Sequence, residues 1–76
     1  MKISFVLPAK EQVRLTIYDV RGRLVRRLLD EEMPPGFKEV LWDGRDERGG
    51  RASSGVYFYE LRAAKDMLTR KMVLLK

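Results

Sequence analysis

The chain contains no cysteine and no histidine, and these two absences exclude several kinds of chemistry. Without cysteine, neither a disulfide nor a thiolate metal site can form. Without histidine, the chain lacks the commonest general base and the commonest metal ligand, and a Ser-His-Asp triad is impossible. Ser53 and Ser54 are therefore interpreted as polar residues leading into a strand. We expect no catalysis and no required cofactor.

Long apolar runs are absent as well. The longest, Val56 to Tyr59 and Met72 to Leu75, have four residues each, whereas a membrane-spanning helix needs ~20. The first residues contain too short an apolar core for a signal peptide. We therefore expect no membrane span, and a chain of 76 residues is expected to form one small domain over residues 1–76.

Basic residues are abundant: 16 lysines and arginines against 11 acidic residues give a net charge of +5. Arg21, Arg23, Arg26 and Arg27, combined with aromatic side chains, are typical of proteins that bind single-stranded nucleic acid. The aromatic candidates are Tyr18, Trp42, Tyr57, Phe58 and Tyr59. Their spacing fits a hydrophobic core equally well, and no RNA-binding signature such as RNP1 is present. We retain nucleic-acid binding only as an alternative.

Turn-forming residues recur at short intervals along the chain. The predicted turns are Pro8-Ala9-Lys10, Arg21-Gly22, Pro34-Pro35-Gly36, Asp43-Gly44, Gly49-Gly50 and Lys65-Asp66. Between them apolar and polar residues alternate, as at Val13, Leu15 and Ile17. This pattern predicts an all-β protein, a small antiparallel β-sandwich of about six to seven strands with Trp42 in its core.

One segment, Gly22 to Glu32, has a pattern that fits two structures. Its apolar residues, Leu24, Val25, Leu28 and Leu29, are spaced as on an amphipathic helix. The preceding residues, Asp19 to Gly22, instead have the composition of a hairpin turn. Because the neighbouring strands need a partner along their edge, we predict a strand here.

Three acidic residues, Asp43, Asp46 and Glu47, lie within five positions of one another. Oxygen-rich loops can bind calcium, but the spacing is not that of an EF-hand. Arginines also lie among the acids, and they compete with a cation for the carboxylates. We interpret the segment as a hairpin loop, with weak calcium binding as an open alternative.

Several short motifs follow one another along nearly the whole chain. They are a Tyr-Asp-x-x-Gly-Arg hairpin (Tyr18, Asp19, Gly22, Arg23), a Trp-Asp-Gly-x-Asp segment (Trp42, Asp43, Gly44, Asp46) and a Gly-x-Tyr pair (Gly55, Tyr57). In this order they resemble the FlgD-like immunoglobulin-fold domain. The resemblance implies an immunoglobulin-like sandwich in which the tryptophan is core and the Asp and Gly residues shape turns.

The family resemblance implies two non-catalytic settings. One is a C-terminal module of large secreted bacterial proteins, similar to the sorting domains of type IX secretion. The other is the bacterial flagellar hook-capping protein, a scaffold around which hook subunits assemble. The basic ending, Arg70 to Lys76, favours the first. We therefore predict a C-terminal module of a larger extracellular or cell-surface protein that acts in sorting, attachment or protein–protein interaction, with the hook-cap scaffold as an alternative.

The final strand is the predicted partner-binding element. Its backbone can pair with a partner along a sheet edge, and Arg70, Lys71 and Lys76 add charge attraction. The expected partners are proteins: secretion or surface-attachment machinery, or upstream domains of the parent protein. Charged residues on an edge strand also serve simply to keep it soluble.

Overall fold

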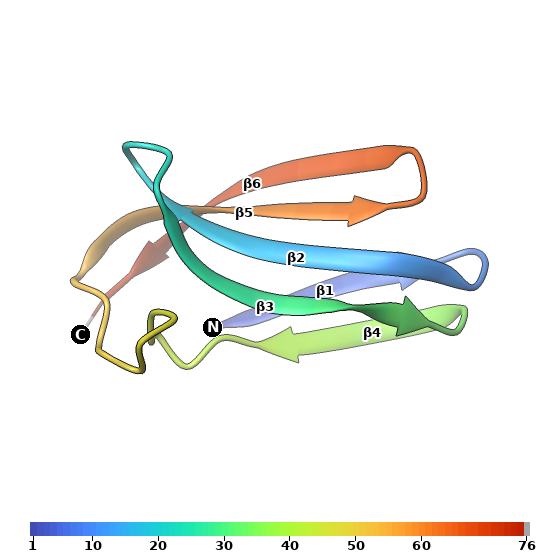
Figure 1. The fold of residues 1–76 in the computed structure, drawn as a ribbon, viewed down its shortest axis with the longest axis horizontal. Helices are drawn as coiled ribbons and strands as arrows, with labels where there is room; N and C mark the ends of the chain where they lie inside the picture. The colour runs from blue at the N-terminus through green and yellow to red at the C-terminus, as the bar shows by residue number, and fades with distance from the viewer. Residues whose placement is uncertain (76) are drawn as a thin grey trace.

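Six antiparallel strands form two sheets in the computed structural model, which describes residues 1–75. The strands are β1 (Lys2–Leu7), β2 (Glu11–Asp19), β3 (Leu24–Met33), β4 (Gly36–Leu41), β5 (Gly55–Ala63) and β6 (Asp66–Leu74). One sheet has the order β3-β2-β5-β6, and the other pairs β1 with β4 (Figure 1). The described residues contain no helix, so the predicted all-β, immunoglobulin-like sandwich is confirmed.

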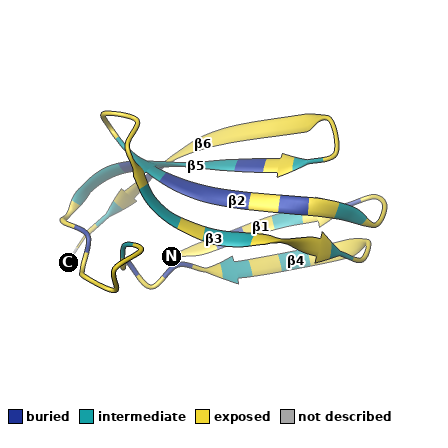
Figure 2. Cartoon of the chain, in the orientation of Figure 1, coloured by how far each residue is buried: buried dark blue, intermediate teal, exposed yellow. Residues whose placement is uncertain are grey.

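The core lies between the two sheets and is centred on β2. Val13, Leu15 and Ile17 are fully buried at 0% exposure, as their alternation predicts. Opposite them, the second layer contributes Ile3, from β1, and Trp42, which follows β4. Figure 2 shows this burial concentrated on β2 and fading along the outer strands. Each fully buried aliphatic side chain contributes about 1.5–3 kcal/mol to stability.

The segment Gly22 to Glu32 contains no helix: Gly22 belongs to the turn, and from Leu24 onward the chain is strand β3, which pairs antiparallel with β2. The pairing shifts register twice, between the partners of Leu15 and Thr16 and again between those of Ile17 and Tyr18. A β-bulge inserts one extra residue and changes which side chains face inward. Val25, Leu28 and Leu29 therefore all pack against the core, and their spacing imitates a helix.

The hairpin between β5 and β6 turns one residue earlier than the predicted Lys65-Asp66. Ala63 and Asp66 already pair, so Ala64 and Lys65 form a two-residue loop. Ala64 has a φ of 55°, the left-handed conformation that hairpin loops of this length require. No residue type that favours positive φ marks the position, and this explains the error of one residue.

The two sheets differ in width, since one has four strands and the other has two. Behind β2 and β3 the core is backed by β1 and β4, whereas β5 and β6 extend beyond the free edge of β1 (Figure 1). Part of the inner face of β5 and β6 therefore has no opposing strand among residues 1–75. Within residues 1–75, no helix has the length and hydrophobicity needed to cross a membrane.

Candidate protein-interaction surfaces

The acidic loop after β4 is held by its own carboxylates. Asp43 accepts a hydrogen bond from the Arg45 backbone N–H at 3.0 Å. Asp46 accepts two, from the N–H groups of Arg48 at 2.9 Å and Gly50 at 3.0 Å. Asp and Asn side chains commonly stabilise turns in this way. The acids thus bind their own backbone, as in a turn. The segment is not the predicted hairpin loop, however, because it connects β4 in one sheet to β5 in the other.

Glu47 fastens the same loop to the edge of β3. Its N–H donates to the carbonyl of Val25 at 3.0 Å, and its carboxylate accepts from the N–H of Arg27 at 2.6 Å. Arg26 adds an ion pair with Asp43 at 3.3 Å. These contacts satisfy edge groups in the first half of β3, while the second half carries exposed acids. Both devices protect a sheet edge against unwanted pairing.

The carboxylates proposed for calcium do not converge on one point. Asp43 and Asp46 bind different backbone groups, and Glu47 turns toward β3. In the described part of the chain, no three acidic side chains are grouped as metal ligands. Calcium binding by Asp43, Asp46 and Glu47 stays an untested alternative.

Trp42 and Tyr57 join this loop to the core. Their rings meet edge to face with centroids 5.4 Å apart, a favourable aromatic geometry. The indole N–H donates to the carbonyl of Arg45 at 3.0 Å, and the Tyr57 hydroxyl donates to the carbonyl of Ser53 at 2.6 Å. A tyrosine that bonds to backbone a few residues upstream also occurs in other immunoglobulin-like sandwiches. Trp42 is therefore buried in the core, and Tyr57 packs against it.

The β2–β3 hairpin is organised by Asp19. Its carboxylate accepts hydrogen bonds from the N–H groups of Arg21 and Arg23, both at 2.9 Å, and from the Arg23 guanidinium at 3.1 Å. The backbone hydrogen bond from Arg23 is the main cause that lowers the pKa of Asp19 below its usual value. Gly22 completes the turn with a φ of 78°. Asp19 and Gly22 therefore shape a turn, as expected.

The residues proposed for nucleic-acid binding are divided between the core and the outer face of the larger sheet. Trp42 and Tyr57 are buried, whereas Tyr18 and Phe58 pair with each other across β2 and β5. Arg23 and Arg26 are engaged by Asp19 and Asp43, respectively. A single-strand binder needs exposed aromatic rings beside cations. Of the proposed residues, Tyr18 and Arg27 line one groove on the outer face, and nucleic-acid binding stays an untested alternative.

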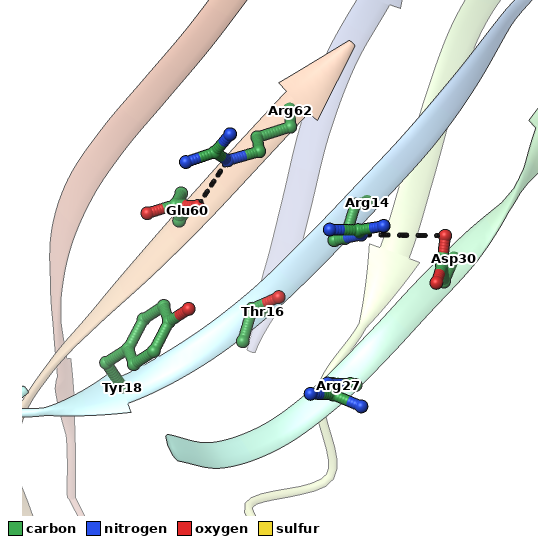
Figure 3. Close-up of a pocket in the computed structure, with 7 residues that line it drawn as sticks. All are labelled: Arg14, Thr16, Tyr18, Arg27, Asp30, Glu60 and Arg62. Atoms are coloured by element: carbon green, nitrogen blue, oxygen red, sulfur yellow. Dashed lines mark hydrogen bonds and ion pairs between the residues drawn. The ribbon is translucent and has the colours of Figure 1, made fainter. Parts of the chain in front are cut away.

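The outer face of the larger sheet instead carries a polar groove of about 390 Å³ (Figure 3). The lining residues are Arg14, Thr16, Tyr18, Arg27, Asp30, Glu60 and Arg62. Arg14 and Asp30 lie 3.7 Å apart, and Arg62 bonds to Glu60 at 2.7 Å, which raises the pKa of Arg62. Two of the three arginines thus have an acidic partner. Tyr18, expected to be structural, lines this groove.

The predicted partner-binding strand, β6, pairs with β5 on one side only. Arg70 lies opposite Tyr59 and Lys71 opposite Phe58, so the two cations point to opposite faces of the sheet. Neither forms an ion pair with any residue in the described range 1–75. The third predicted contact, Lys76, lies outside the described residues. Partner binding by these three residues stays a prediction.

Sequence reasoning missed a second free edge, that of β1. An apolar groove lies beside it, between β1 and the β5–β6 hairpin. Its signal in the sequence is weak, because Val6, Met67 and Leu68 look like ordinary strand residues and only the fold exposes them. Val6 is 69% exposed and Met67 57%.

Comparison with known proteins identifies the same family twice. The family model of the FlgD Ig-like domain matches residues 1–66. The crystal structure of FlgD from P. aeruginosa superposes with a TM-score of 0.73 at 28% identity, covering 95% of this chain and 55% of that chain. The chain thus spans about half the length of that FlgD. No curated protein matches the chain.

These matches correct the predicted function. The interpretation as a C-terminal sorting or attachment module of type IX secretion is wrong, because both matches are to FlgD and neither supports a sorting domain. The expected extracellular or cell-surface location was inferred from that interpretation and is corrected with it. The error came from the basic last strand. The family match ends at residue 66, where β6 begins, and basic residues on an edge strand are not specific to sorting.

Proposed function

Because this chain belongs to the FlgD Ig-like domain family, we propose that it is a non-catalytic scaffold module of a flagellar hook-capping protein. The observation that carries the proposal is the agreement of two comparisons, one of sequence over residues 1–66 and one of structure over 95% of the chain. FlgD-like domains form a structural family, and the lack of histidine and cysteine accords with a role that requires no chemistry.

A scaffold module works through surfaces that hold other proteins in place. In this chain the loop from Asp43 to Ala52 covers part of the β3 edge, whereas no strand within residues 1–75 pairs with the outer edge of β6. Bare strands recruit partners by backbone pairing, and nearby charges guide orientation and rate. We therefore place the contact with hook subunits on the β6 edge, with Arg70 and Lys71 as guiding charges. We further propose that residues 1–76 form a single module within a larger protein.

The test replaces the matching domain of P. aeruginosa FlgD with this chain and measures hook formation and motility in a strain without its own FlgD. The proposal expects the chimera to support hooks. A second chimera carries Arg70→Glu and Lys71→Glu and is expected to form fewer hooks. Its control carries Arg21→Glu and Arg48→Glu, which make the same charge change at exposed turns. A folded, exported chimera that makes no hooks would contradict the proposal.

A further inference from the structure

The free edge of β1 lies beside an apolar groove of about 300 Å³. Its apolar lining comes from both layers: Phe5 and Leu7 of β1, Leu61 and Ala63 of β5, and Met67 and Leu68 of β6. No residue of β4 lines it, so the groove is on the unpaired side of β1. Pockets of this size hold several side chains. The groove therefore lies where a third strand of the smaller sheet would pair with β1.

The backbone of β1 offers hydrogen-bonding groups toward this groove. Met1 and Trp42 exchange two backbone bonds of 2.8 Å, so they are a hydrogen-bonded pair. Such pairs alternate along an antiparallel ladder, and Ile3, Phe5 and Leu7 are the next to bond β4. The N–H and C=O groups of the residues between them, such as Ser4 and Val6, turn to the free edge. Nothing within residues 1–75 hydrogen bonds to these groups.

Two carboxylates stand at the end of the groove where β1 finishes. Glu11 and Asp66 both line it, and neither has an ion-pair partner among residues 1–75. Lys10, although next to Glu11 in sequence, pairs with Glu32 at 3.3 Å. Free acids beside an apolar groove are notable in a chain with a net charge of +5. Charge complementarity favours an occupant with a cation at this end.

We propose that this groove binds an extended segment of a partner protein, which adds as a third strand beside β1. The occupant alternates apolar and polar residues and carries a lysine or arginine between Glu11 and Asp66. A helix cannot satisfy the free backbone groups of Ser4 and Val6, whereas a strand can. The β5–β6 hairpin borders the groove through Asp66, Met67 and Leu68, so the occupant lies between β1 and this hairpin. This inference specifies the kind of partner segment that the scaffold would bind, and to that extent it rests on the proposed scaffold function.

The probe is an acetylated peptide, Lys-Val-Thr-Val-Thr-Val, whose lysine reaches the acidic end when the peptide runs antiparallel to β1. Titration of the whole chain is followed by amide chemical shifts in NMR. We expect saturable shifts at Ser4, Val6 and Leu68. A peptide with Glu in place of Lys, and the chain with Glu11→Gln and Asp66→Asn, should both bind about tenfold more weakly. Glu31→Gln, a charge change on β3, should leave the affinity unchanged.

A proline pair tests the backbone contact. Val6→Pro removes an N–H that faces the groove but spares the bonds to β4, and it should weaken binding about tenfold. Phe37→Pro is the matched control: Phe37 lies opposite Val6, is 63% exposed, and its N–H faces the other edge, away from β1. This variant should bind normally. Both variants are checked for folding by their amide spectra.

Three outcomes would overturn the proposal: no saturable shifts at millimolar peptide, shifts confined to β6, or equal effects of the two prolines. Shifts at β1 that depend on the chain's own concentration, without peptide, would assign the edge to a second copy instead. Hook formation by the chimera described above is measured separately. Loss of peptide binding with intact hook assembly therefore refutes the groove alone, and the reverse result refutes only the hook-cap role.

Discussion

The two ends of the sandwich are built in opposite ways. At the closed end, Trp42, Tyr57 and the loop from Asp43 to Ser54 cover the core, and loop carboxylates and carbonyls accept hydrogen bonds. At the open end, around Glu11 and the β5–β6 hairpin, apolar side chains and acids face solvent. A small domain has little core to spare. The comparison indicates that stability is concentrated at one end and surface available to partners at the other.

The largest expected effect is at the closed end. Trp42 is 1% exposed, contacts Tyr57 and donates to the carbonyl of Arg45. Trp42→Ala should lower the free energy of unfolding by about 3–5 kcal/mol, since it leaves a cavity and an unpaired carbonyl. Urea denaturation measures the change. A loss below about 1 kcal/mol would mean that the closed end does not dominate stability.

A smaller loss is expected from Gly44→Ala at the same end. Gly44 has a φ of 78°, and a methyl group there would lie 3.7 Å from Leu74, an ordinary contact. The cost is therefore backbone strain of about 1–2 kcal/mol and not a clash. Gly50→Ala is the control, because its φ is not in the left-handed region and its nearest neighbour is Asp46 at 3.5 Å. Equal melting temperatures for the two variants would contradict this account.

Asp19, in the turn at the closed end, makes the stability of the fold depend on pH. Its pKa is lowered in the folded state, chiefly by the backbone hydrogen bond from Arg23, so folding favours the ionised form. The stabilisation is present above the unfolded pKa, near 3.8, and is lost as pH falls through the lower folded value. Asp19→Asn should therefore flatten the fall in urea midpoint between about pH 2 and pH 5. Identical pH profiles of the urea midpoint for both proteins would show that ionised Asp19 does not contribute to stability.

The smallest effect is expected at the open end. Met67 is 57% exposed and lines the groove beside β1. Met67→Ser should change the free energy of unfolding by less than about 0.5 kcal/mol, while it weakens binding of the strand peptide. A loss comparable to that of Trp42→Ala would show that the hairpin end also carries the fold, and the contrast between the ends would fail.

The features that the sequence predicts correctly are those determined by residues close together in the chain. The alternation of Val13, Leu15 and Ile17 and the turns at Asp19 and Asp43 act over a few residues, so they can be read directly from the chain. The bulges in β3 depend on pairing with β2, and for that reason Leu24 to Leu29 resembled a helix. The groove needs β1 and β6, residues far apart in sequence, to lie together. The basic residues at the end of the chain led to the wrong interpretation as a sorting domain, because a charge pattern alone carries little functional specificity.

The positions of the chain ends have a consequence for how the module is tethered. Met1 bonds to Trp42, and Leu74 lies against Gly44, so both ends emerge at the closed end. The groove is lined by Leu7, Pro8 and Asp66, which lie at the β1–β2 and β5–β6 turns, and these turns lie at the opposite end of the strands (Figure 1). Polypeptide that precedes Met1 or follows Leu74 would enter and leave on the side opposite the groove. The domain would then project from its attachment point, and the open end with the groove would face away from the adjoining parts of the polypeptide.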